Sequence, residues 1–187
     1  MGAEFRAGTL ENLLLWEPSR LKVLAAKLLA GMMSTVVVII MLLTFLTGLL
    51  FLLAALRGNF FGTDSTFWED LALTFGRIGL VSGAFFGLAM AIATITRHTV
   101  AAVASILGLS VLSAFISLLL PSIYRFELFN NAAAFIQHSD VSISRRVDDQ
   151  FYQEFSHSYL IAGLIVALWM IIPVVLATFV FSRRDIA

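Results

Sequence analysis

Residues 28–56 read LLAGMMSTVVVIIMLLTFLTGLLFLLAAL, a run of twenty-nine residues without one charged side chain. As an α-helix, which rises about 1.5 Å per residue, this run reaches about 43 Å. The hydrocarbon core of a bilayer is only about 30 Å thick. A helix on the surface of a soluble protein needs a polar face, and this run has none. The sequence therefore predicts a membrane-spanning helix here, long enough to tilt.

Three further stretches are also free of charge, and they cover residues 78–96, 99–120 and 158–182. Each is near or above about 18 residues, the length that marks a spanning helix. One charged residue at mid-bilayer costs about 2.5–3.5 kcal/mol on insertion scales, so four empty stretches are a strong signal. We expect an all-α, polytopic membrane protein that forms one transmembrane domain over residues 1–187. Its four spans would cover about 28–56, 78–96, 99–120 and 158–182, with an external segment at 121–157.

The composition agrees with this class and excludes others. Sixty percent of the residues are hydrophobic and 13% are charged, whereas soluble domains carry about 25% charged residues. The net charge is zero, so no general attraction to nucleic acid is expected. The chain has no cysteine, which excludes disulfides, thiol nucleophiles and zinc–thiolate sites. It also lacks a Gly-x-x-x-x-Gly-Lys-Ser/Thr phosphate loop, so we expect no enzyme activity, cofactor or metal in this chain.

The distribution of basic residues predicts which way the helices cross. With four spans, both termini and the turn at 96–98 share one side of the membrane. That side holds seven basic residues: Arg6, Arg20, Lys22, Lys27, Arg97, Arg183 and Arg184. The other side holds five: Arg57, Arg77, Arg125, Arg145 and Arg146. Because Lys and Arg favour cytoplasmic loops, we expect a multi-pass protein of the cytoplasmic membrane with both termini in the cytoplasm.

The segment before the first span predicts a short amphipathic helix. Gly8 permits a turn, and Thr9 after it is a suitable N-cap. Pro18 ends this helix, and Ser19 can cap the next one. The apolar face of the short helix would consist of Leu10, Leu13 and Leu14. From the residues alone, a helix that rests on the bilayer surface remains an equal alternative to a helix that binds a partner.

Several strings in this segment resemble one transporter family. EFRAGTL at 4–10 is followed by two leucines at 13–14, EPSR at 17–20 and Ala-Lys at 26–27. Together they look like the E-x-x-x-G-T-L … L-L … P-x-x-R … K stretch of ABC-2 type permeases, the membrane subunits of bacterial ABC transporters. In that family the stretch forms the cytosolic coupling helix. The ending FSRRD at 181–185 is also similar to the family's C-terminus, and the order of spans agrees over nearly the whole chain.

The resemblance implies a permease subunit that moves a substrate across the cytoplasmic membrane, by export. A separate cytosolic ATP-binding cassette subunit would hydrolyse ATP, and two permease subunits would pair as a homo- or heterodimer. Since the family has six spans, the resemblance also implies that the first two are missing here. The leucines would dock in a groove of the ATPase, a helix-in-groove mode of recognition. The implied ATPase-coupling interface consists of Glu4, Arg6, Gly8, Thr9, Leu10, Glu11, Leu13, Leu14, Pro18, Arg20 and Lys27.

The second predicted span carries a row of glycines. Gly79, Gly83 and Gly87 are spaced four apart, and Ala91 continues the row. On a helix such a row forms a smooth stripe that lets another helix approach closely. We expect it to serve helix packing within the subunit, with a dimer seam as the alternative.

The external segment 121–157 is apolar enough at its start to lie in the membrane interface, and the resemblance implies short helices there. Its polar residues match no metal-ligand spacing, so a solvated loop is the favoured interpretation. These residues are His138, Asp140, Asp148, Asp149, Glu154 and His157.

Two other functions compete with transport. One is a non-transporting anchor or scaffold that presents its N-terminal helix to a cytosolic partner. The other, an intramembrane enzyme, is disfavoured because no His, Cys, Asp or Glu lies inside a span. The substrate stays open, since apolar spans with scattered Ser and Thr suit drugs, lipids, peptides or glycans alike.

Overall fold

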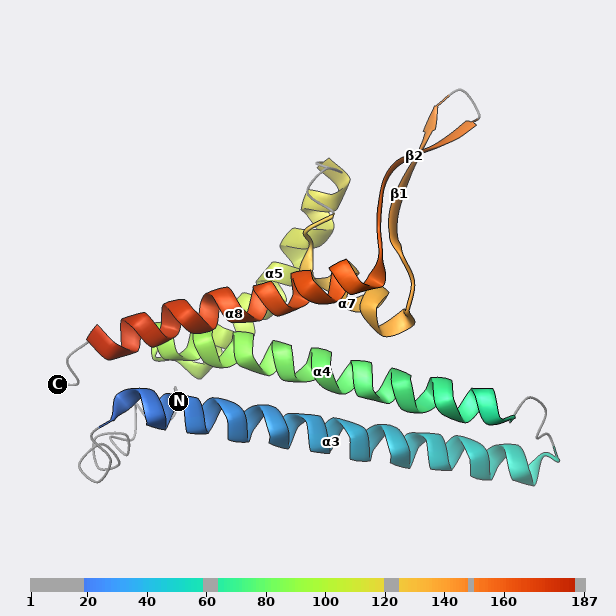
Figure 1. Cartoon of the computed structure of the whole chain (residues 1–187), viewed down its shortest axis with the longest axis horizontal. Coiled ribbons are helices and arrows are strands. Elements are labelled where there is room, and N and C mark those ends of the chain that lie inside the picture. The colour runs from blue at the N-terminus through green and yellow to red at the C-terminus, as the bar shows by residue number, and fades with distance from the viewer. Residues whose placement is uncertain (1–18, 59–63, 120–124, 148–149, 184–187) are drawn as a thin grey trace.

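The computed structural model describes residues 19–58, 64–119, 125–147 and 150–183. Within them five helices and one two-stranded sheet follow each other (Figure 1). The elements in chain order are α3 (Arg20–Leu56), α4 (Ser65–Thr96), α5 (Thr99–Leu119), α7 (Leu128–Gln137), β1 (Val141–Val147), β2 (Gln150–His157) and α8 (Tyr159–Arg183).

Helix α3 begins where the sequence predicts a new helix after Pro18. The Ser19 side chain accepts a hydrogen bond from the backbone N–H of Lys22 at 3.4 Å, which confirms Ser19 as the N-cap. The helix then continues without a break to Leu56. Of the coupling segment predicted at residues 1–20, residues 1–18 lie outside the described residues.

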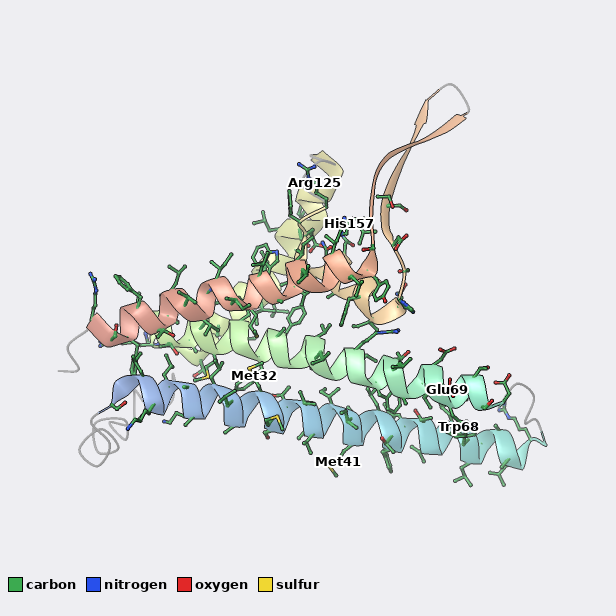
Figure 2. The ribbon with its side chains drawn as sticks, viewed as in Figure 1. Met32, Met41, Trp68, Glu69, Arg125 and His157 are labelled. Atoms are coloured by element: carbon green, nitrogen blue, oxygen red, sulfur yellow. The ribbon has the colours of Figure 1, made fainter. Side chains whose placement is uncertain are left out.

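Helix α4 is longer than expected, because it begins at Ser65 rather than near residue 78. The carboxylate of Asp64 accepts from the backbone N–H of Phe67 at 3.0 Å and from the Thr66 hydroxyl at 2.9 Å, so Asp64 caps the helix. The charge-free stretch marked only the apolar part of α4. Its first turns also carry Glu69 and Asp70, which lie at the start of the helix (Figure 2).

Three of the described helices are long and apolar enough to cross a membrane: Leu21–Leu56, Ser65–Thr96 and Tyr159–Arg183. The apolar stretch of α5 that can be assessed, Thr99–Ser113, is shorter than such a span. The described structure is therefore nearly all-helical, with long apolar helices suited to a membrane, and the number of four spans stays a prediction.

Helices α3 and α4 run antiparallel along most of their length, and α8 crosses over α4 (Figure 1). One core cluster joins α4, α7 and α8: Val81, Leu88, Leu128, Ala132 and Val166. A second joins α3, α4 and α8: Leu24, Met90 and Phe181. Met32 points from α3 toward α4, whereas Met41 points away and is 68% exposed (Figure 2). Outward apolar side chains of this kind suit contact with lipid.

The segment between α5 and α8 differs from the expected short helices and polar loop. It contains α7 and then an antiparallel hairpin, in which Val141 pairs with His157 and Ser142 with Ser156. A register shift between Ile143 and Ser144 interrupts the ladder. The hairpin projects away from the helices (Figure 1). The all-α prediction is therefore wrong for residues 141–157, where two strands form.

Candidate functional site

Most residues of the predicted coupling interface cannot be placed, because they lie outside the described residues: Glu4, Arg6, Gly8, Thr9, Leu10, Glu11, Leu13, Leu14 and Pro18. Two remain. Arg20 is the first residue of α3, and Lys27 is half-buried about two turns further along the same helix.

Basic residues gather at one end of the helix bundle, which we call the basic end. Lys22 and Lys27 lie near the start of α3, Arg97 follows the last residue of α4, and Arg183 ends α8. These helix ends meet, since Leu24, Met90 and Phe181 pack together there. The guanidinium of Arg183 lies 4.0 Å from the centre of the Phe179 ring, a cation–π contact.

Acidic residues within the described part of the chain lie away from the basic end. Three stand at the start of α4 and three in the α7–hairpin segment: Asp64, Glu69, Asp70, Glu127, Asp140 and Glu154. Other described basic residues lie in the same regions as these acidic ones: Arg57, Arg77, Arg125, Arg145 and Arg146. The asymmetry among the described residues is therefore that the basic end has cations without carboxylates, whereas both signs occur elsewhere.

The glycine row of α4 is buried and faces helices of the same chain. A Cβ built on Gly79 would lie 3.3 Å from Val36 of α3, and one on Gly83 would lie 3.5 Å from the same side chain. A Cβ on Gly87 would lie only 2.8 Å from Met170 of α8. The row thus lets α3 and α8 approach α4 closely.

Two glycines outside the row have the same role, and the spacing rule did not single them out. A Cβ on Gly31 would overlap the ring of Phe86, so α4 places an aromatic ring directly over α3. A Cβ on Gly163 would lie 2.7 Å from the ring of Phe135. Phe135 of α7 therefore rests on the backbone of α8. Neither glycine belongs to a row of glycines spaced four apart, so the spacing rule could not predict their role.

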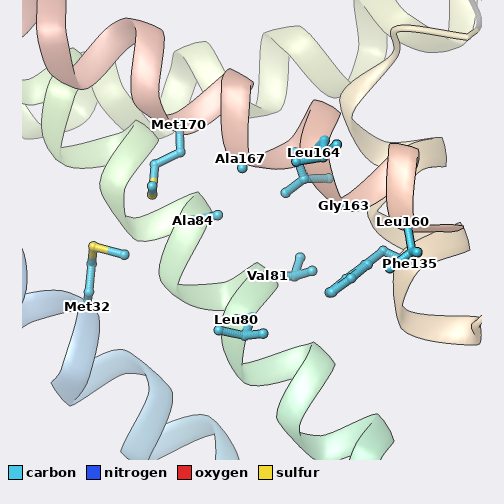
Figure 3. A pocket seen from close by; sticks show the side chains of 11 residues that line it. Met32, Leu80, Val81, Ala84, Phe135, Leu160, Gly163, Leu164, Ala167 and Met170 are labelled. Carbon is cyan, nitrogen blue, oxygen red and sulfur yellow. The ribbon is translucent and has the colours of Figure 1, made fainter.

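A cavity of about 510 Å³, which we call the larger cavity, lies between α3, α4, α7 and α8. Figure 3 shows Met32, Leu80 and Met170 on three of these helices, with Phe135 closing the α7 side. Its side chains are all apolar: Met32, Leu80, Val81, Ala84, Phe135, Leu160, Leu164, Val166, Ala167 and Met170, together with Gly163. Such a cavity suits an apolar group and offers no side chain that would select a charged one.

The smaller cavity, of about 410 Å³, lies at the basic end between α3, α4 and α5. Four alanines make its wall smooth: Ala30, Ala89, Ala93 and Ala102. Phe86, Met90 and Val103 complete the apolar lining, while Lys27 and Thr99 supply the polar groups. Unlike the larger cavity, this one combines an apolar interior with a cationic side chain.

A buried polar network joins α7 to His157, the last residue of β2, which lies two residues before the start of α8. The Asn131 side chain is fully buried, and its Nδ2 donates to the carbonyls of Arg125 at 3.0 Å and Glu127 at 2.6 Å. With Nδ2 used in this way, Oδ1 is the acceptor that faces Nε2 of His157 at 2.8 Å. Nε2 must therefore carry the proton and donate it. Asn131 therefore links the backbone of Arg125 to the ring of His157, and both of these residues are labelled in Figure 2.

Other groups strengthen the same junction. The Glu127 carboxylate caps α7 by accepting from the backbone N–H groups of Phe129 at 2.9 Å and Asn130 at 2.5 Å. Nε1 of Trp169 in α8 donates to the carbonyl of Phe126 at 2.9 Å. Burial lowers the pKa of His157 below its ordinary value, and the nearby Asp140 carboxylate offsets part of that effect. This pKa shift favours the neutral ring, whose Nε2–H is sufficient for the hydrogen bond to Asn131.

The candidate metal ligands of the sequence do not form a cluster in the part of the chain that the structure describes. No group of three His, Asp or Glu side chains there lies close enough to hold an ion. His157 instead pairs with Asn131, a partner that ligand-spacing rules do not consider.

Comparison with known proteins places the whole chain in one family. A family model described as "Protein of unknown function (DUF2705)" matches residues 1–187, so the chain belongs to this family. No curated protein and no solved structure matches the chain.

Proposed function

We propose that this member of the DUF2705 family is the membrane-spanning permease subunit of an ATP-binding cassette transporter. It would export a substrate across the cytoplasmic membrane with ATP hydrolysed by a separate cytosolic subunit. The observation that carries the proposal is the string EFRAGTL, followed by EPSR, directly before a spanning helix. ABC-2 type permeases carry a similar string as their coupling helix.

The start of α3 supports this assignment. The predicted coupling segment, residues 1–20, ends at Arg20, which is also the first residue of α3, and Ser19 caps the helix there. A force applied to the segment would therefore act directly on a helix of 37 residues, which is about 55 Å long. The basic end would lie in the cytoplasm, in agreement with the preference of Lys and Arg for that side.

The packing of α4 suggests how such a force would be used. The glycine row places only small groups of α4 against Val36 of α3 and Met170 of α8. Smooth helix faces of this kind slide with less steric resistance than interlocked side chains do. A shift of α3 along α4 would change the larger cavity, because Met32 of α3 forms part of its lining. In this mechanism, movement of the coupling segment alters the space between α3, α4 and α8.

Co-purification with candidate ATPases tests the coupling role. Each cytosolic ATP-binding cassette ATPase of the host would be co-expressed with the full chain and with a Leu10→Asp/Leu14→Asp variant. We expect one ATPase to co-purify with the full chain, to hydrolyse ATP faster in the reconstituted complex, and to be lost from the double variant. Ala3→Asp, which adds charge to the same segment outside the leucine face, serves as the control. Equal recovery with the double variant would exclude the proposed docking face.

Topology mapping provides a second test and separates transport from scaffolding. Because the chain has no cysteine, single Ser19→Cys and Ser139→Cys variants report their own positions. In intact cells a membrane-impermeant maleimide should label position 139, while position 19 should react only after permeabilisation. Labelling of position 19 in intact cells would refute the proposal. A partner that binds the leucine face but shows no change in ATP hydrolysis would favour the scaffold.

A further inference from the structure

We propose that the smaller cavity binds an anionic membrane lipid, with the headgroup at Lys27 and part of an acyl chain in the alanine-lined slot. The inference rests on the orientation assigned under the proposed function, which places the basic end at the cytoplasmic leaflet. It does not depend on coupling to an ATPase.

The cavity has polar groups toward one end and an apolar wall along the rest, which matches the two parts of an amphiphilic molecule. Thr99 begins α5 and so lies at the end where α4 and α5 join. Lys27 precedes Leu28, which faces Gly87 of α4, and a side chain on a helix leans toward the helix N-terminus, here toward the same end as Thr99. From Ala93 the apolar wall continues along α4 to Phe86, seven residues or about 10 Å deeper into the bundle. One end can therefore hold a charged headgroup, while the rest can hold only hydrocarbon.

The shape of the slot follows from its small side chains. Ala30 and Ala89 come from facing helices, and Ala102 closes the α5 side. Alanines on three neighbouring helices leave a volume of about 410 Å³ that larger side chains would fill. A water molecule is not stabilised in such a slot because it needs two to four hydrogen-bonding partners, whereas a hydrocarbon chain needs none.

The charge at the mouth selects an anion. Lys27 is half-buried, so its ammonium approaches the ligand from a partly desolvated position, where charge interactions are stronger than in water. An ammonium has three N–H donors and can bind a phosphate while it also contacts the protein. Basic pockets between spanning helices on the cytoplasmic side bind anionic headgroups in general.

The experiment compares lipids with the same acyl chains and different headgroups. Purified full-length protein in detergent would be titrated with phosphatidylglycerol, phosphatidylcholine and soluble glycerophosphate, and binding would be followed by native mass spectrometry and by the thermal unfolding midpoint. We expect phosphatidylglycerol to bind and to raise the midpoint more than phosphatidylcholine does. Glycerophosphate should have no effect, because it has no chain for the slot.

Three variants of cavity residues test the geometry, and one control tests the charge. Lys27→Gln should weaken phosphatidylglycerol binding about fivefold, as expected for one basic residue near a charged headgroup. Lys27→Arg should restore the preference, and Ala89→Leu should abolish it by filling the slot. Lys22→Gln, on an exposed residue of the same helix that does not line the cavity, should bind like the unaltered protein.

Several outcomes would overturn the proposal. Equal binding of the two lipids would remove the role of the charge, and equal losses in Lys22→Gln and Lys27→Gln would indicate diffuse surface attraction. A change of oligomeric mass in Ala89→Leu without a change in lipid preference would assign the slot to a second copy of the chain. None of these results affects the co-purification test, so the two proposals fail separately.

Discussion

Replacement of Asn131 by alanine should release α7 from α8. The Asn131 side chain is fully buried and makes three hydrogen bonds, to His157 and to the carbonyls of Arg125 and Glu127. A buried polar group left without a partner costs about 1–3 kcal/mol. The His157 ring N–H would lose its acceptor completely. The Glu127 carbonyl still accepts from the backbone N–H of Asn131, and Arg125 is exposed, so these carbonyls lose less.

The docking of α7 should therefore weaken by about 2–4 kcal/mol. If α7 opens and closes faster than the maleimide reacts, a weakening of this size raises the fraction of molecules with α7 undocked about 30- to 700-fold. A single cysteine at Ala134, which is 6% exposed and packs against α8, would detect the opening by its rate of maleimide labelling. No other thiol is present to interfere.

The neighbouring Asn130→Ala variant is the matched control, since it makes the same substitution in the same helix and keeps Asn131. It should label at close to the unaltered rate. Asn131→Ala labelling that is no faster than this control would refute the view that Asn131 holds α7 in place.

Three further outcomes are expected. Because burial lowers the pKa of His157 below its ordinary value of 6.5, the undocked state binds the proton more readily. Docking of α7 should be at full strength above pH 6.5 and weaken as the pH falls below it. His157→Gln should remove this pH dependence. The rate of maleimide labelling at position 134 is divided by that of a free thiol at each pH. Gly87→Ala should lower the thermal midpoint through a cost of about 1–3 kcal/mol, because its Cβ would lie 2.8 Å from Met170. Gly76→Ala, with nothing within 4 Å, should raise the midpoint, and a reversed order would contradict the packing. Glu127→Ala should destabilise α7 by about 1 kcal/mol through loss of its cap, measured by the same labelling, while Glu127→Gln should retain much of it.

The long helices were predictable because a bilayer imposes a strong rule on composition. A spanning segment must be apolar over its whole length, so the charge-free run at 28–56 identifies α3 without any other information. The rule marks apolar length and not helix ends. Helix α4 therefore extends to Ser65 through residues that the rule excludes, since Asp64 supplies a cap that stabilises the helix outside the apolar part.

The hairpin carried a local signal that the helical context concealed. VSISRRV and QFYQEFSH alternate between apolar and polar residues for part of their length, with two aspartates between them. Alternation with a period of two around a turn is the usual pattern of a β-hairpin. The apolar residues just before the hairpin favoured the prediction of a helix on the membrane surface, and α7 forms at those residues.

The pairing at the junction of α7 and α8 was beyond sequence reasoning. Asn131 and His157 are 26 residues apart, and no spacing rule connects a lone asparagine with a lone histidine. The two cavities were equally hidden, because they depend on which faces of three or four helices meet. The glycine row was visible, but its partners Val36 and Met170 were not.

The unequal apolar lengths of α3 and α4 have a consequence for the surrounding bilayer. Gly79 of α4 faces Ile40 of α3, and beyond that point α3 continues for sixteen uncharged, mostly apolar residues, about 24 Å. The turns of α4 beside them carry Arg77, Asp70 and Glu69. Hydrocarbon thickness adapts to a protein at a cost of fractions of a kcal/mol per Å of mismatch. The hydrocarbon layer should consequently be thicker beside α3 than beside α4. The thickness of the bilayer would then vary around the protein, and neighbouring membrane proteins would meet a different thickness on each side.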